Sequence, residues 1–113
     1  MTLIYAAIGF FALAALLGMY LLSFVLQGKE TPKAIVFTHG PMATIGVVLL
    51  ITYAMKGGPS PTESLVLFVL AALGGLYMVF RDLSGKPIPK FLAVGHGLLA
   101  VAGFIFLLIF ALG

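Results

Sequence analysis

Long stretches without any charged residue make up most of the chain, and short polar segments separate them. Four such stretches cover residues 2–28, 34–55, 65–80 and 91–113. A helix needs about 20 apolar residues to cross a bilayer, so each stretch is a candidate span. The third has only 16 residues, which cover about 24 Å as a helix. We therefore expect Arg81, just after it, to extend its side chain to the surface, or the bilayer to thin there.

Composition agrees with a membrane protein, because 63% of the residues are hydrophobic, 8% are charged and the mean hydropathy is +1.28, outside the range of soluble domains. The first stretch has no basic residue before it and is too long for the apolar core of a signal peptide, so we expect it to remain as a helix. The 113 residues would form one domain embedded in the lipid bilayer.

Basic residues mark one side of the predicted membrane domain. Only Lys56 lies in the second loop, whereas the first and third loops carry the other five cations: Lys29, Lys33, Arg81, Lys86 and Lys90. The positive-inside rule then places these two loops in the cytoplasm and both termini outside it, which we expect in a bacterial inner membrane. No soluble basic surface exists to bind nucleic acid.

The sequence repeats itself with an offset of 57 residues. Residues 15–46 and 72–103 align without a gap, with 13 of 32 positions identical, and both histidines of the chain coincide. Each copy is a helix, a basic loop and a helix, so the copies enter the membrane in the same direction. We predict an all-α, integral membrane four-helix bundle made of two duplicated parallel helical hairpins, residues 1–56 and 65–113.

Glycines and prolines in the loops predict where helices begin and end. Gly28 and Gly85 should terminate the incoming helices, and Pro32 and Pro89 suit the first turn of the helices that follow. Before the third helix, Thr62 or Ser64 could cap the first turn. Pro41 in the second stretch should kink that helix beside a histidine.

Both histidines lie six residues after the second lysine of their loops, at a depth of about 9 Å along the helix. His39 shares a helix face with Ala43 and Gly46. His96 shares its face with Ala100 and Gly103. Each imidazole would therefore look over a strip with almost no side chains, which leaves room for a helix or for a flat ligand.

Two imidazoles at equal depth on parallel helices predict a metal between them. A closed zinc site needs four protein ligands, and neither a thiol nor a carboxylate is near. A haem supplies four ligands itself and needs only two axial histidines, here His39 and His96. Lys33 and Lys90 would pair with its propionates. The small residues would contact the macrocycle, and these cofactor-binding candidates are Ala43, Gly46, Ala100 and Gly103.

This arrangement resembles the membrane-bound b-type cytochromes, including the haem-binding core of cytochrome b and small four-helix membrane cytochromes. The motif that carries the resemblance is the repeated His-Gly-x-x-Ala-x-x-Gly after each loop. Those proteins often bind two haems through a second histidine on each ligand helix, but Tyr53 and Phe110 occupy the positions fourteen residues after His39 and His96. The resemblance thus implies one haem b per chain.

The expected function is electron transfer, to or from a quinone or a partner redox protein, as part of a membrane oxidoreductase if an enzyme at all. Two alternatives stay open. The chain could be a structural or accessory subunit, as a homo- or hetero-oligomer, with each histidine bonded to a facing carbonyl or to Tyr20 and Tyr77. It could also be a small transporter or channel with a histidine proton gate. No catalytic residue is expected, since every acid lies in or beside a loop.

Overall fold

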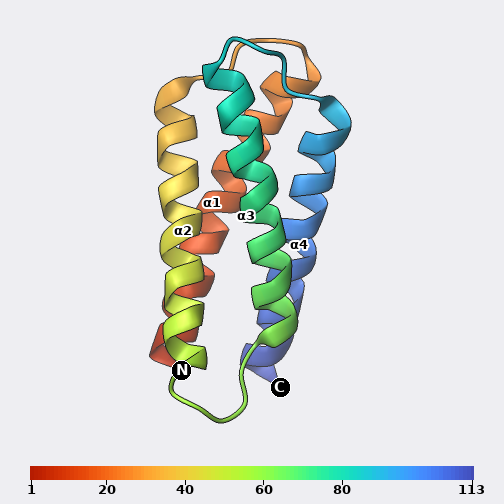
Figure 1. Ribbon diagram of the computed structural model, residues 1–113. Coiled ribbons are helices and arrows are strands. Elements are labelled where there is room, and N and C mark those ends of the chain that lie inside the picture. The colour runs from red at the N-terminus through yellow and green to blue at the C-terminus, as the bar shows by residue number, and fades with distance from the viewer.

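The computed structural model describes all residues 1–113 and contains four α-helices and no strands. They form an elongated bundle (Figure 1). In chain order the helices are α1 (Thr2–Leu26), α2 (Lys33–Ala54), α3 (Thr62–Leu83) and α4 (Lys90–Leu112). The all-α four-helix fold predicted from the sequence is confirmed.

All four helices are long and apolar enough to cross a membrane. The bundle measures 44 Å along its longest axis, comparable to a bilayer of about 40–45 Å with its headgroup regions. Helix α3 is longer than its 16 charge-free residues, because it begins at Thr62 and ends at Leu83. Its charged residues Glu63, Arg81 and Asp82 therefore lie within its end turns, so the helix extends beyond residues 65–80 at both ends.

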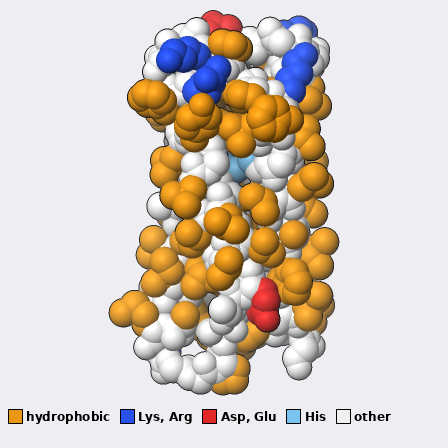
Figure 2. Space-filling view, turned by 45° about the vertical axis from the view of Figure 1, so that its right-hand side comes forward, with side chains coloured by type: hydrophobic (Ala, Val, Ile, Leu, Met, Phe, Trp, Pro, Cys, Tyr) orange, Lys and Arg blue, Asp and Glu red, His pale blue; other side chains and the backbone are white.

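The helices occupy the corners of a square. Helix α1 packs mainly on α2, and α3 mainly on α4, while α1–α4 and α2–α3 form the seams between the two hairpins. The loops α1–α2 and α3–α4 lie at one end of the bundle, and the α2–α3 loop lies at the other end with both termini (Figure 1). Blue lysine and arginine side chains gather at one end of the face drawn in Figure 2.

On the face drawn in Figure 2, hydrophobic side chains extend along the length of the bundle. Only 15 of 113 residues are buried, and large hydrophobic side chains such as Leu76, Phe80 and Ile109 are exposed. A soluble monomer does not expose so much contiguous apolar surface. This surface is compatible with an integral membrane protein whose outer faces contact lipid.

The buried residues follow the same repeat of 57 positions. Fourteen of the 15 buried residues form seven pairs with this spacing, and Thr31 is the only one whose counterpart, Ile88, is not buried. The pairs are Ile4/Pro61, Ala7/Ser64, Phe11/Phe68, Ala14/Ala71, Val36/Ala93, Gly46/Gly103 and Leu50/Leu107. The repeat of the core thus begins before residue 15 and continues beyond residue 46, the limits seen in the sequence.

Two of the expected helix boundaries are present and two are not. Gly28 and Gly85 follow α1 and α3 with φ of 68° and 75°, a conformation that favours glycine. Pro32 and Pro89 precede the first helical residue as N-caps instead of lying in the first turn.

The predicted cap of α3 by Thr62 or Ser64 is wrong. Pro61 holds the N-cap position without a side-chain hydrogen bond, and the Ser64 hydroxyl donates across the bundle to the carbonyl of Gly103 at 2.8 Å. In α2, the helix runs without interruption through Pro41.

Candidate functional site

The two histidines meet inside the bundle. His39 on α2 and His96 on α4 come from helices at opposite corners of the square, and their ring centroids are 6.2 Å apart with an angle of 75° between the planes. Both rings are partly buried. The structure therefore brings together the only two imidazoles of the chain, as their coinciding positions in the repeat suggested.

Each histidine is bonded to the backbone of the other helix in its own hairpin. The Nδ1 atom of His39 lies 2.8 Å from the carbonyl oxygen of Ala14 on α1, and that of His96 lies 2.7 Å from the carbonyl oxygen of Ala71 on α3. A carbonyl can only accept, so Nδ1 carries the proton and donates. In the neutral ring the Nε2 atom then presents a lone pair, as a metal ligand must.

The Nε2 atoms have no hydrogen-bond partner in the protein. Every fully enclosed side-chain nitrogen or oxygen does have one, so neither Nε2 atom is sealed inside the core. The lone pair of each Nε2 atom is thus not used by the protein itself.

Gly18 and Gly75, which lie on the other helix of each hairpin, make room for the imidazoles. A Cβ atom at Gly18 would lie 2.9 Å from Cε1 of His39, and one at Gly75 would lie 3.1 Å from Cε1 of His96. Any larger residue would push the ring from its carbonyl partner. The glycines on α1 and α3 thus help to fix the ring positions on α2 and α4.

The strip beside each histidine is filled and not vacant as expected. A Cβ atom at Gly46 would lie 2.7 Å from the Phe11 ring, and one at Gly103 would lie 3.3 Å from the Phe68 ring. The two phenylalanine rings stack on each other, with centroids 3.7 Å apart and planes within 3°. Gly46 and Gly103 therefore accommodate an aromatic pair that closes the centre of the bundle.

Sequence reasoning missed this aromatic pair. Phe11 and Phe68 are themselves identical at the repeat spacing of 57, but they lie just outside the aligned segment. Ala43 and Ala100 are partly buried and lie one turn from the histidines, between them and the stacked rings. They are the small residues that remain beside the imidazoles.

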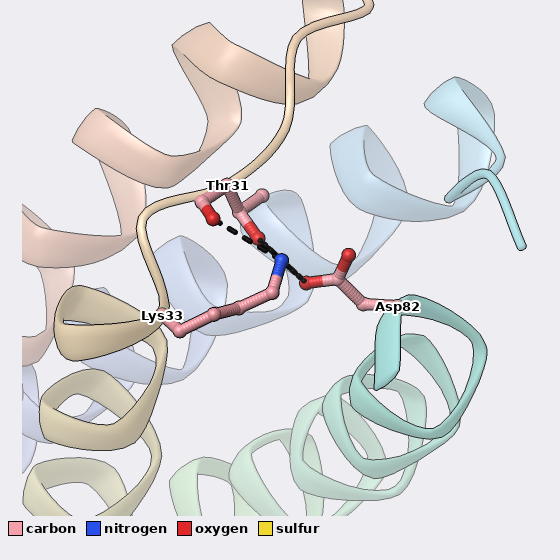
Figure 3. Close-up of polar contacts among 3 residues, drawn as sticks. All are labelled: Thr31, Lys33 and Asp82. Carbon is pink, nitrogen blue, oxygen red and sulfur yellow. Dashed lines mark hydrogen bonds and ion pairs between the residues drawn. The ribbon is translucent and has the colours of Figure 1, made fainter. Parts of the chain in front are cut away.

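At the basic end, Lys33 is already engaged by protein groups (Figure 3). Its Nζ atom lies 3.0 Å from a carboxylate oxygen of Asp82 on α3 and 2.9 Å from the Thr31 hydroxyl oxygen. The Thr31 hydroxyl donates to the same carboxylate at 2.6 Å. Lys90, its counterpart in the second repeat, forms no ion pair and is exposed.

The two lysines proposed for the propionates therefore differ. Lys90 has its charge free for an anion, whereas the charge of Lys33 is balanced by Asp82. The position equivalent to Asp82 in the first repeat is Val25, so Lys90 has no corresponding acid to pair with.

No group of three or more histidine, cysteine, aspartate or glutamate side chains could hold a metal ion. A closed zinc site of four protein ligands is thus not formed. The remaining donor set is the histidine pair alone. A metal there would need to bring further ligands of its own.

No protein family, curated protein or solved structure matches the chain.

Proposed function

We propose that the chain is a membrane electron-transfer protein that binds one b-type haem between His39 and His96. The observation that carries the proposal is the paired geometry of the two imidazoles, 6.2 Å apart across the bundle. With a metal–nitrogen bond of about 2.0 Å, two imidazoles at this separation could each offer one ring nitrogen to a metal held between them.

The hydrogen bonds of the histidines support the same ligand role. Metal-binding histidines usually donate their second ring N–H to a carbonyl or carboxylate, which fixes the tautomer and the ring orientation. Ala14 and Ala71 supply such carbonyls. With only two protein ligands, haem fits better than a bare ion, because the porphyrin supplies four nitrogens.

The rest of the chain would bury and orient the group. Ala43 and Ala100 are the small residues nearest the imidazoles along α2 and α4, and Lys90 offers a free cation for a propionate, with Lys33 as a weaker candidate because of Asp82. Gly46 and Gly103 hold phenylalanine rings, so we do not assign them to the cofactor. When bound, the iron would accept and release single electrons.

The electron partner would be a quinone in the bilayer or a partner redox protein. We place the protein in a bacterial inner membrane with the basic loops in the cytoplasm, on the positive-inside rule. The histidines would then lie about 9 Å below the cytoplasmic lysines.

Visible spectroscopy of the purified protein tests the proposal. We expect a sharp haem band that changes on reduction with dithionite and is lost in His39→Gly and in His96→Gly. Added imidazole should restore the band in either variant, because a free imidazole can take the place of the missing ligand. Thr38→Ala is the matched control, since that hydroxyl bonds only to its own helix at Ala34.

A wild-type protein that stays colourless after reconstitution with haem, or glycine variants that keep the wild-type spectrum, would exclude the proposal. Circular dichroism should first show that each variant remains helical.

A structural role for the histidines is the second candidate, favoured by the hydrogen bonds to Ala14 and Ala71. Such bonds tie α2 to α1 and α4 to α3 without any cofactor. This role predicts a loss of thermal stability in the glycine variants with no spectral change and no rescue by imidazole. The histidine proton gate is less favoured, because the stacked Phe11 and Phe68 rings close the bundle below the histidines.

A further inference from the structure

The second hairpin has a groove on its side, between α3 and α4. The groove has a volume of about 480 Å³, with Leu70 and Gly74 on one wall and Phe91, Gly95 and Ala102 on the other. His96 also lines it. Figure 2 shows a histidine ring visible between apolar side chains, below the basic end of the bundle. This groove opens toward the lipid and is almost wholly apolar.

The first hairpin carries bulkier residues at three of the nine positions equivalent to those that line the groove. A Cβ atom at Gly95 would meet nothing within 4 Å, so this glycine leaves the groove open. Phe91 is an exception in the other direction, because it is much larger than its counterpart in the first hairpin, Ala34. The positions that open the groove and their bulkier counterparts are Gly74 and Leu17, Gly95 and Thr38, and Ala102 and Ile45.

An arginine lies at the basic end of this groove. Arg81 is on the same face of α3 as Leu70 and Gly74, because it follows them by eleven and seven residues. Its Nε atom donates to the carbonyl of Pro87 at 2.9 Å, and its guanidinium carbon lies 6.0 Å from the centre of the Tyr77 ring. These contacts hold the guanidinium in place while leaving further donors free.

A lysine without an ion-pair partner lies beside it. Lys86 belongs to the loop that joins the two walls of the groove, and its backbone N–H donates to the Arg81 carbonyl at 2.9 Å. Neither side chain forms a salt bridge, and Asp82, the acid next to Arg81 in the sequence, pairs with Lys33.

The first hairpin does not repeat this charge pattern. Phe24 stands at the position of Arg81, and Glu30 follows Lys29 where Pro87 follows Lys86. Gly74, Gly95 and Ala102 therefore occur together with an arginine only in the second hairpin.

We propose that this groove and its two cations bind one anionic phospholipid. An acyl chain would lie along the apolar walls, and the phosphate would contact Arg81 and Lys86. Basic pockets between transmembrane helices recognise anionic headgroups in this way, and a neutral headgroup would leave both cations unpaired. The proposal does not depend on the function of the histidines.

Native mass spectrometry of the full chain in detergent tests it, with phosphatidylglycerol and phosphatidylcholine added in equal amounts. The wild type should retain one phosphatidylglycerol in preference to phosphatidylcholine. Arg81→Gln should lower this retention by about fivefold, because one headgroup cation is worth about that factor. Gly95→Leu should lower it as well, because the new side chain enters the groove without a clash at its Cβ.

Two matched variants control for charge and for size. Lys56→Gln removes one cation from the other end of the bundle, and Gly9→Leu adds the same side chain on α1, where a Cβ atom also meets nothing within 4 Å. Both should retain the lipid as the wild type does. Equal retention of the two lipids, or an equal loss in the controls, would overturn the proposal.

Discussion

At the scale of single residues, two glycines determine where the imidazoles lie. A Cβ atom at Gly18 or Gly75 would press on the carbon atom between the two ring nitrogens of His39 or His96. The carbonyls of Ala14 and Ala71 accept a hydrogen bond from the neighbouring nitrogen of each ring. The ring cannot retreat from a new methyl group without lengthening its hydrogen bond. The positions of the two histidines thus depend on residues of α1 and α3 that have no side chain.

Gly18→Ala should destabilise the protein by about 1–3 kcal/mol, as overpacking of a filled interior does. Gly75→Ala should cost less, because its Cβ would lie 3.1 Å from the ring and not 2.9 Å. Thermal unfolding in detergent measures both effects. The control is Gly9→Ala, where the Cβ meets nothing within 4 Å and the change should be neutral or slightly stabilising. Equal unfolding temperatures for all three variants would contradict this account.

At the scale of helices, a buried hydroxyl distinguishes the packing of α3 on α4. Ser64 is almost fully buried and donates to the Gly103 carbonyl, whereas its counterpart in α1 is Ala7. Since alanine fits the equivalent place in the first hairpin, Ser64→Ala removes a hydrogen bond without leaving a large cavity.

We expect Ser64→Ala to lower the free energy of unfolding by about 0.6–1 kcal/mol, the usual worth of such bonds between membrane helices. Thermal unfolding in detergent again provides the measurement. Thr38→Ala removes an exposed hydroxyl that bonds within its own helix, and it should change the stability less. A loss for Thr38→Ala as large as for Ser64→Ala would argue against the interhelical bond.

The sequence predicted the helices and the meeting of the histidines, but not the packing between them. Charge-free stretches predict membrane-spanning helices well, because charged residues are costly in lipid. The repeat with an offset of 57 residues places both imidazoles at the same depth. The sequence does not tell which helix faces fill the centre, so Phe11 and Phe68 were not assigned to the strips beside Gly46 and Gly103. The end turns of α3 were missed because Glu63, Arg81 and Asp82 interrupt the apolar pattern.

At the scale of the whole molecule, one ion pair joins the two hairpins at the basic end. Lys33 and Thr31 belong to the first hairpin and Asp82 to the second (Figure 3). The histidine and Ser64 hydrogen bonds each lie within one hairpin. This link could not be predicted from the repeat, because Val25 replaces Asp82 in the first copy.

Asp82→Asn should lower the stability by less than about 1 kcal/mol, since Lys33 is 38% exposed and solvent screens such pairs. The difference from wild type should shrink as salt is added. Unfolding temperatures at low and high ionic strength measure this. Glu30→Gln removes an acid of the same end that forms no ion pair, and it should show little effect at either salt concentration.

The orientation of the whole bundle gives a further prediction. The chain has no cysteine, so a single introduced cysteine reports its own side of the membrane. Ser84→Cys lies at the basic end and should react with a membrane-impermeant maleimide only after the inner face is opened. Ser60→Cys, in the α2–α3 loop, should react in intact cells. The opposite pattern would place the lysines outside.

The pairing of buried residues at a spacing of 57 has a consequence for the origin of this molecule. Two identical copies of one hairpin, related by a twofold axis along the membrane normal, would bury these seven pairs of positions equally. Such a homodimer, fused into one polypeptide after duplication of its gene, accounts for the core that is still shared. The positions at which the copies now differ, such as Pro41, Asp82 and Arg81, would then have diverged after the fusion, when each half was present only once.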